Sequence, residues 1–125
     1  MNYLLKYSVF ENIDKYEEDF DDLKDIFNDL KDEDYEIKFY KFVLDNNFKI
    51  VIKSNLKDFH INNSLISVLK RAVYFMTELG YRYSASYRTK FGPRSYKFLV
   101  EDEKSLKDTH ANCWRISCID IGFYI

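Results

Sequence analysis

The sequence predicts an α+β protein in which a single antiparallel sheet carries two helices on one face. Two segments, residues 14–34 and 63–79, place apolar residues at steps of three and four, which is the period of a helix with a buried side. The segments around them alternate apolar and polar residues, the period of a strand with one buried face. The chain has 125 residues, 46% of them hydrophobic, and only 3 glycines and 1 proline, so we expect one ordered domain over residues 1–125.

The first predicted strand is residues 2–10, an apolar and β-prone stretch. The first helix follows it, because Asp14 and Glu17 match the capping box of a helix start. The buried stripe of this helix consists of Ile13, Tyr16, Phe20, Leu23, Phe27 and Leu30. Residues 35–44 and 48–52 then alternate on either side of a polar turn, which predicts a hairpin.

Asn63 or Ser64 is predicted to cap a second helix. This helix runs to Leu79, because Gly80 after it is a typical left-handed stop. Apolar residues surround most of this helix: Leu65, Ile66, Val68, Leu69, Ala72, Val73, Phe75, Met76 and Leu79. We therefore expect it either in the centre of the core or partly at a subunit interface.

The C-terminal part of the chain is predicted to be mostly strand. Residues 81–90 and 96–100 form a second hairpin, residues 101–111 a charged loop, and residues 112–125 a final strand. The full order is β-α-β-β-α-β-β-β. Its first six elements follow the ferredoxin-like pattern, and the last two strands extend that core.

Charge is unevenly distributed along the chain. The formal net charge is only −2, but residues 11–35 contain 12 of the 21 acidic residues and only 3 lysines. The rest of the chain is net positive, so the molecule is expected to be a strong dipole. On the first helix the acids form a row beside the apolar stripe, and we single out Glu18, Asp21, Asp22, Asp25, Asp29 and Asp32.

This acidic row is either the solvated face of an amphipathic helix or a docking surface. Carboxylates four residues apart repel each other by about 0.2–0.5 kcal/mol per pair, and acids near a helix C-terminus oppose its dipole. Because stability alone favours lysines there, the retained negative charge indicates a function. In composition the segment resembles the acidic inhibitors that phages and mobile elements use against restriction or CRISPR nucleases. The resemblance implies a non-enzymatic anti-defence inhibitor whose helix at residues 14–34 docks on a basic, nucleic-acid-binding protein.

A second candidate surface is a basic strand. Arg82 and Arg88 alternate with tyrosines, and Lys90 and Arg94 follow toward the turn. Arginine forms bidentate bonds with phosphate and tyrosine stacks on bases, so this strip predicts nucleotide or nucleic-acid binding. The alternatives are the ordinary polar face of an antiparallel sheet and contact with the acidic row of a second copy in a homodimer.

The pattern LKDxHxN occurs twice, at residues 56–62 and 106–112, and contains both histidines of the chain, His60 and His110. Three interpretations are open. The pattern reflects similar turn and cap chemistry, a metal site of aspartates and histidines, or an acid and base pair resembling that of the two-histidine phosphoesterases. In those enzymes Thr or Ser stands two positions after the histidine, whereas asparagine stands there in both copies here. The helix and hairpin before each copy suggest two tandem α-β-β units.

No motif of a standard enzyme or cofactor site occurs. The chain has no glycine-rich phosphate loop, no Cys-x-x-Cys, no HExxH and no nucleophile elbow, so we expect a binding protein without catalytic activity, cofactor or metal. Cys113 and Cys118 are expected to be buried free thiols, because their spacing along a strand keeps them too far apart to bridge. No apolar run approaches the roughly 18 residues that span a bilayer, and signal-peptide features are missing, so we expect a cytoplasmic protein.

Overall fold

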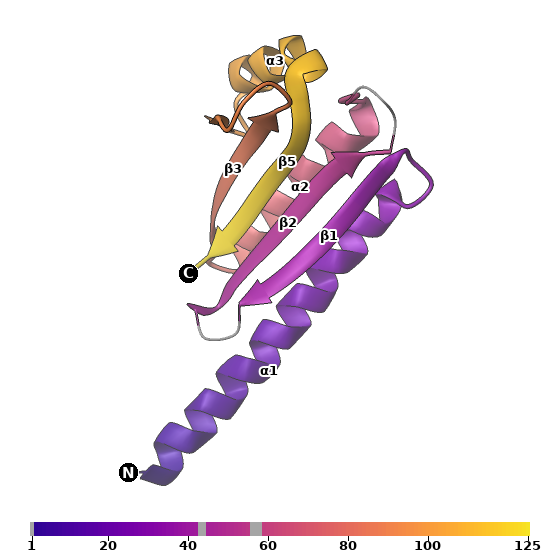
Figure 1. The fold of residues 1–125 in the computed structure, drawn as a ribbon. Helices are drawn as coiled ribbons and strands as arrows, with labels where there is room; N and C mark the ends of the chain where they lie inside the picture. The colour runs from indigo at the N-terminus through magenta and orange to yellow at the C-terminus, as the bar shows by residue number, and fades with distance from the viewer. Residues whose placement is uncertain (1, 43–44, 56–58) are drawn as a thin grey trace.

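The computed structural model describes residues 2–42, 45–55 and 59–125, with the backbone alone for residues 2–14 and 113. Within these residues the chain forms three α-helices and one five-stranded antiparallel sheet of order β1-β2-β5-β3-β4, which confirms the predicted α+β class (Figure 1). The elements in chain order are α1 (Asn2–Phe27), the short 3₁₀ helix η1 (Asn28–Leu30), β1 (Tyr35–Phe42), β2 (Asn47–Ser54), α2 (Asn63–Glu78), β3 (Arg82–Thr89), β4 (Ser95–Phe98), α3 (Glu103–Ala111), the 3₁₀ helix η3 (Cys113–Arg115) and β5 (Ile116–Tyr124).

α1 and α2 both lie on one face of the sheet, and the core fills the space between them and the strands (Figure 1). The predicted stripe of α1 is buried from Tyr16 to Leu30, while Ile13 lies outside the residues whose side chains are described. Tyr16 and Phe20 stack on Phe48 of β2, with ring centroids 4.4 and 5.1 Å apart. The core also contains Leu65, Leu69 and Met76 of α2 and Ile50, Ile52, Ile119, Ile121 and Phe123 of the sheet.

α2 begins and ends close to the predicted positions. Its N-cap is Asn62, one residue before the predicted cap at Asn63 or Ser64, and the Oδ1 of Asn62 accepts a hydrogen bond of 2.8 Å from the backbone N–H of Leu65. Gly80 after the helix has φ +99°, the left-handed conformation that glycine adopts most easily. No helix in the described part of the chain is both long and apolar enough to cross a membrane.

The predicted first strand is wrong, because residues 2–10 form the first turns of α1. A short apolar run cannot be assigned to helix or strand by periodicity alone, and here it continues the helix that follows it. The predicted helix start at Asp14, with its capping box to Glu17, is therefore wrong as well. The predicted helix end at residue 34 is also wrong, because α1 ends at Phe27 and η1 continues the chain only to Leu30. Figure 1 shows that the N-terminal part of α1 runs beyond the end of the sheet.

Residues 101–111, predicted as a charged loop, form α3, and the last strand begins later than predicted. The N-cap of α3 is Asp102, whose side chain accepts a hydrogen bond of 3.0 Å from the backbone N–H of Lys104. α3 buries only Leu106 and Thr109. Its apolar period is too weak to be recognised between the charged residues.

The sheet has a ferredoxin-like arrangement that is completed by a different strand from the predicted one. β2 and β3 run in the same direction, since both are antiparallel to β5, which lies between them. With α2 connecting β2 to β3, these elements form a split β-α-β unit. The C-terminal strand β5 thus occupies the central position that the pattern assigns to an N-terminal strand.

Candidate functional site

One face of the sheet carries no helix from the part of the chain that the structure describes (Figure 1). In Figure 1 α1 and α2 lie behind the sheet, and this helix-free face is turned toward the viewer. Side chains alternate along a strand, so the residues between the core residues point to this face. Its charged residues are six cations, Lys38, Lys49, Lys53, Arg82, Arg88 and Lys97, and two carboxylates, Glu36 and Asp120.

The strand register brings cations of four strands together. Lys53 of β2 and Arg88 of β3 lie in one row across the sheet, separated by a single residue of β5. Lys38 of β1 and Lys97 of β4 occupy the two ends of the next row, which has Asp120 of β5 in its middle. The helix-free face is therefore positive from one edge of the sheet to the other.

Two ion pairs between described residues neutralise part of this charge. Arg88 Nε lies 3.1 Å from Oδ2 of Asp120, whose side chain is 15% exposed, and this carboxylate raises the pKa of Arg88. Lys38 and Glu36 are 3.7 Å apart and about half exposed, a setting in which an ion pair contributes little. The other four cations have no ion-pair partner among the described residues: Lys49, Lys53, Arg82 and Lys97.

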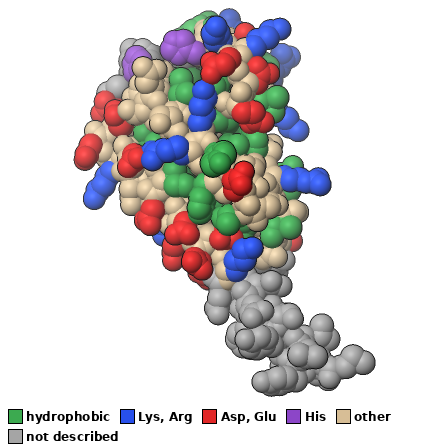
Figure 2. Space-filling model, turned by 180° about the vertical axis from the view of Figure 1, so that it is seen from behind, with side chains coloured by type: hydrophobic (Ala, Val, Ile, Leu, Met, Phe, Trp, Pro, Cys, Tyr) green, Lys and Arg blue, Asp and Glu red, His purple; other side chains and the backbone are tan. Residues whose placement is uncertain are grey.

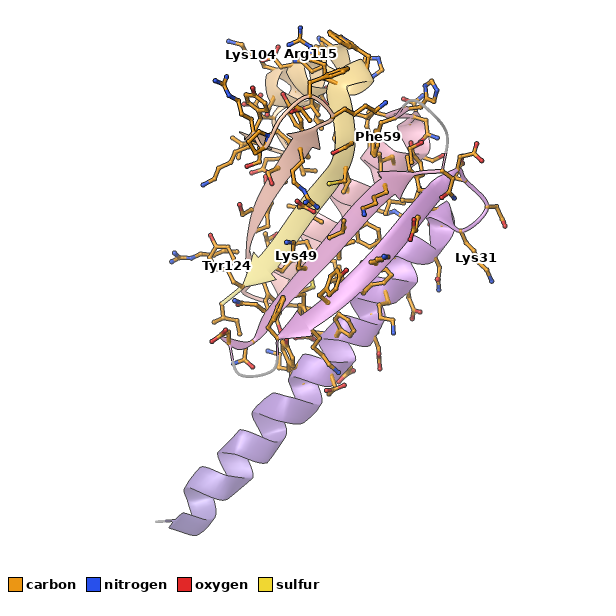
Figure 3. The ribbon with its side chains drawn as sticks, viewed as in Figure 1. Lys31, Lys49, Phe59, Lys104, Arg115 and Tyr124 are labelled. Atoms are coloured by element: carbon orange, nitrogen blue, oxygen red, sulfur yellow. The ribbon has the colours of Figure 1, made fainter. Side chains whose placement is uncertain are left out.

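Two shallow hollows adjoin on the helix-free face. The first, of about 260 Å³, we call the cationic hollow; its lining includes Lys38, Tyr40, Phe42, Lys49, Lys53 and Arg88. The second, of about 320 Å³, we call the Gly122 hollow; its lining includes Phe42, Lys49, Ser84, Asp120, Gly122 and Tyr124. The two are neighbours because Phe42 and Lys49 line both. Figure 3 views this face and labels Lys49 on β2 and Tyr124 at the end of β5.

Aromatic rings are exposed beside these cations. Tyr40, Phe42 and Tyr124 are 43%, 48% and 38% exposed. Apolar rings gain free energy when they leave water, and a group of them on one surface is typical of a site that contacts a ligand. Their flat faces offer stacking partners for other rings.

The predicted basic strip is divided between two places. Arg82 and Arg88 lie on the helix-free face, as the alternation of β3 predicted. Lys90 and Arg94 are exposed in the turn between β3 and β4, beyond the strand itself. The sequence alone did not identify the cations of β1, β2 and β4 or the Gly122 hollow as parts of the site. Alternation along a strand shows only that a residue faces outward. The strand order shows that these cations meet.

The acidic row lies on the other side of the molecule. All six of its residues are exposed, and Figure 2, seen from behind, shows acidic side chains gathered along α1. Asp29 forms an ion pair with Arg71 of α2. The other five have no ion-pair partner among the described residues: Glu18, Asp21, Asp22, Asp25 and Asp32. Asp19 of the same helix, which the sequence did not distinguish, is only 4% exposed and accepts a hydrogen bond of 2.9 Å from the Tyr81 hydroxyl.

The two copies of LKDxHxN have different conformations. Residues 59–62 of the first copy lead into α2, and residues 56–58 lie outside the described part of the chain. The second copy forms most of α3. The hairpins before them differ as well, since β1 is at the sheet edge while β3 is inside it. The fold therefore does not repeat as two equivalent α-β-β units.

His60 and His110 are both exposed, and Figure 2 shows the histidine side chains at the same end of the molecule. The described residues contain no group of three or more His, Cys, Asp or Glu side chains placed to hold a metal ion. Cys118 is a buried free thiol, as predicted, and the side chain of Cys113 is outside the described part. The acid and base interpretation of the histidines stays a prediction.

A scan against protein-family models and searches of curated proteins and of solved structures found no match to this chain. A function therefore has to follow from the chemistry of its surfaces. The helix-free face combines positive charge, exposed rings and two hollows, whereas the acidic row offers charge alone.

Proposed function

We propose that this protein binds single-stranded nucleic acid on the helix-free face of its sheet. The observation that carries the proposal is that, among the described residues, four cations without ion-pair partners, three exposed aromatic rings and two adjoining hollows lie on one surface. Lysine and arginine neutralise phosphates, and aromatic side chains stack on bases of any sequence. Both groups are needed for a single strand, and this face supplies both.

The exposed rings favour a single strand over a duplex. Base faces are hidden inside a double helix, so Tyr40, Phe42 and Tyr124 have nothing to stack on there. A single strand can turn its bases onto the sheet while its phosphates meet the cations around them. Lys49 stands between the two hollows and is therefore placed to contact phosphate beside a stacked base.

The contacts between cations and phosphates make the predicted nucleic-acid affinity depend on salt to a measurable degree. If these four cations each neutralise one phosphate, affinity falls about 50-fold between about 50 and 200 mM salt, because single strands show a slope of about −0.7 per phosphate contact. A weaker dependence would mean that fewer of these cations touch the backbone.

The test is fluorescence anisotropy with labelled single-stranded RNA and DNA of about ten nucleotides. Lys49→Glu with Lys53→Glu reverses two charges at the cationic hollow, and we expect at least about a tenfold loss of affinity. The matched control is Lys104→Glu with Lys107→Glu, which makes the same charge change on α3; Figure 3 labels Lys104 far from Lys49. An equal loss in both variants, or no binding by the unaltered protein at low salt, would contradict the proposal.

The acidic row supports a second candidate, the docking of a basic, nucleic-acid-binding protein such as a nuclease, in the manner of anti-defence inhibitors. The observation in its favour is that five carboxylates are exposed and have no ion-pair partner in the described part of the chain. A pull-down washed at about 0.05 and then 0.5 M salt, where screening shortens from about 14 to 4 Å, would release such a partner. Asp22→Lys with Asp25→Lys should abolish its capture, and Glu78→Lys with Asp108→Lys should not. Either function suits a cytoplasmic protein.

A further inference from the structure

Gly122 stands in the middle of the sheet at a position that does not need glycine for its backbone. It belongs to β5, opposite Lys49 of β2 and Ser84 of β3. The positive-φ glycines are Gly80 and Gly92 in the described chain, and Gly122 is not among them. A Cβ at Gly122 would meet the backbone oxygens of Phe48 and Ser84 at 3.6 and 4.0 Å, ordinary contact distances.

A glycine inside a strand weakens it, and such a residue often marks a close approach by a ligand. Since neither backbone conformation nor packing accounts for Gly122, its missing side chain is best explained by the space it leaves. The small side chains of Ser84 and Ser86 on the adjoining strand widen that space into the Gly122 hollow.

The lining of the Gly122 hollow matches a nucleobase. Phe42 and Tyr124 supply exposed aromatic rings, and Lys49, Ser84 and Asp120 supply donors and acceptors. A base needs both, because its faces are apolar and its edges carry polar atoms. A purely anionic ligand would make no stacking contact with the two rings, and the Asp120 carboxylate would repel it.

We infer that the Gly122 hollow holds one nucleobase of the bound strand while the neighbouring cationic hollow holds its phosphate. The two hollows adjoin through Phe42 and Lys49, so a single nucleotide reaches both. This inference rests on the proposed function and deepens it: recognition is of a base in a slot, in addition to charge.

The test compares two fills of the hollow with two probes. Gly122→Leu places a large side chain in the hollow, whereas Gly122→Ala adds only a methyl group and leaves most of it open. Each variant is titrated against a labelled single-stranded uridine oligomer of about ten nucleotides and against an abasic oligomer of equal length. We expect Gly122→Leu to lose about tenfold in affinity for the uridine oligomer, the effect of one lost stacking contact, with little change for the abasic probe. Gly122→Ala should bind both like the unaltered protein.

Ser84→Leu fills the same hollow from β3 and serves if Gly122→Leu does not fold, as judged by circular dichroism. Ser95→Leu, on β4 outside both hollows, is the matched control. If the unaltered protein binds both probes equally, or if the filled variants bind uridine normally, the base slot is refuted while nucleic-acid binding stands. If the unaltered protein binds neither probe at low salt, the proposed function itself fails.

Discussion

Replacement of Tyr81 by phenylalanine should destabilise the protein far more than loss of one hydroxyl from the surface. The Tyr81 hydroxyl donates a hydrogen bond of 2.9 Å to Oδ2 of Asp19, and Asp19 is only 4% exposed. Burial and this hydrogen bond raise the pKa of Tyr81, so the hydroxyl keeps its proton and remains a donor. Phenylalanine keeps the ring that packs against Phe48, with centroids 5.5 Å apart, and removes the donor alone.

The magnitude follows from the buried carboxylate. A hydrogen bond to a charged group contributes about 1.5–3 kcal/mol, and its loss leaves Asp19 without this partner. We therefore expect Tyr81→Phe to lower the free energy of unfolding by about 2–3 kcal/mol, a fall of about 10 °C in melting temperature for a domain of this size. Urea denaturation at neutral pH measures it.

The matched control is Tyr74→Phe, which removes a hydroxyl from a side chain that is 69% exposed. It should change stability by less than about 0.5 kcal/mol. A double-mutant cycle with Asp19→Asn should show a coupling of at least about 1 kcal/mol between the two side chains. If Tyr81→Phe is as stable as Tyr74→Phe, the buried hydrogen bond between Asp19 of α1 and Tyr81, the residue before β3, does not stabilise the fold.

Two further predictions concern stability. Asn62→Ala removes the N-cap of α2, whose Oδ1 accepts a hydrogen bond of 2.8 Å from the Leu65 N–H, and should lower the free energy of unfolding by about 1 kcal/mol in urea denaturation. The control Asn63→Ala, one position into the helix, should lower it less. Equal losses in the two variants would contradict the assignment of Asn62 as the cap. At high pH, burial and a hydrogen bond to Glu101 raise the pKa of Tyr83 to about 12, above its usual 10.0. As the pH rises, the unfolded chain therefore loses the Tyr83 proton before the folded chain does, so the free energy of unfolding should fall between about pH 10 and 12. It should fall less steeply in Tyr83→Phe. An equal dependence on pH in that variant would contradict the role of Tyr83.

The sequence was sufficient to predict the packing of the elements that have a clear apolar period. The stripe of α1 from Tyr16 to Leu30 and the stop of α2 at Gly80 both follow from local spacing and turn chemistry, and both are confirmed. The prediction of a strand at residues 2–10 was wrong, because an apolar run has the same composition in a strand and in a helix. The helix α3 was not predicted for the opposite reason, since two buried residues among charged ones leave almost no apolar period to detect.

The candidate site was predictable only in part, because it is a property of strand order. Alternation placed Arg82 and Arg88 on one outer face, but nothing local shows that β5 passes between β2 and β3. Only that order puts Lys53 in the same row as Arg88 and sets Gly122 between Lys49 and Ser84. The separation of charge, by contrast, was visible in the sequence, because residues 11–35 are net negative and the rest of the chain is net positive.

That separation distinguishes the two candidate functions with one set of variants. Asp22→Asn with Asp25→Asn removes two negative charges from the acidic row and relieves repulsion along α1, which should stabilise the protein by about 0.5–1 kcal/mol. If the helix-free face binds nucleic acid, its affinity should rise slightly, by less than about threefold at about 50 mM salt, because the row lies on the far side and is screened over about 14 Å. If the row docks a basic protein, capture of that partner should fall by at least about tenfold, since the lost carboxylates are the contacts themselves. Opposite signs in the two assays would assign nucleic acid to the sheet and a protein partner to the helix, whereas unchanged capture would leave the sheet as the functional surface.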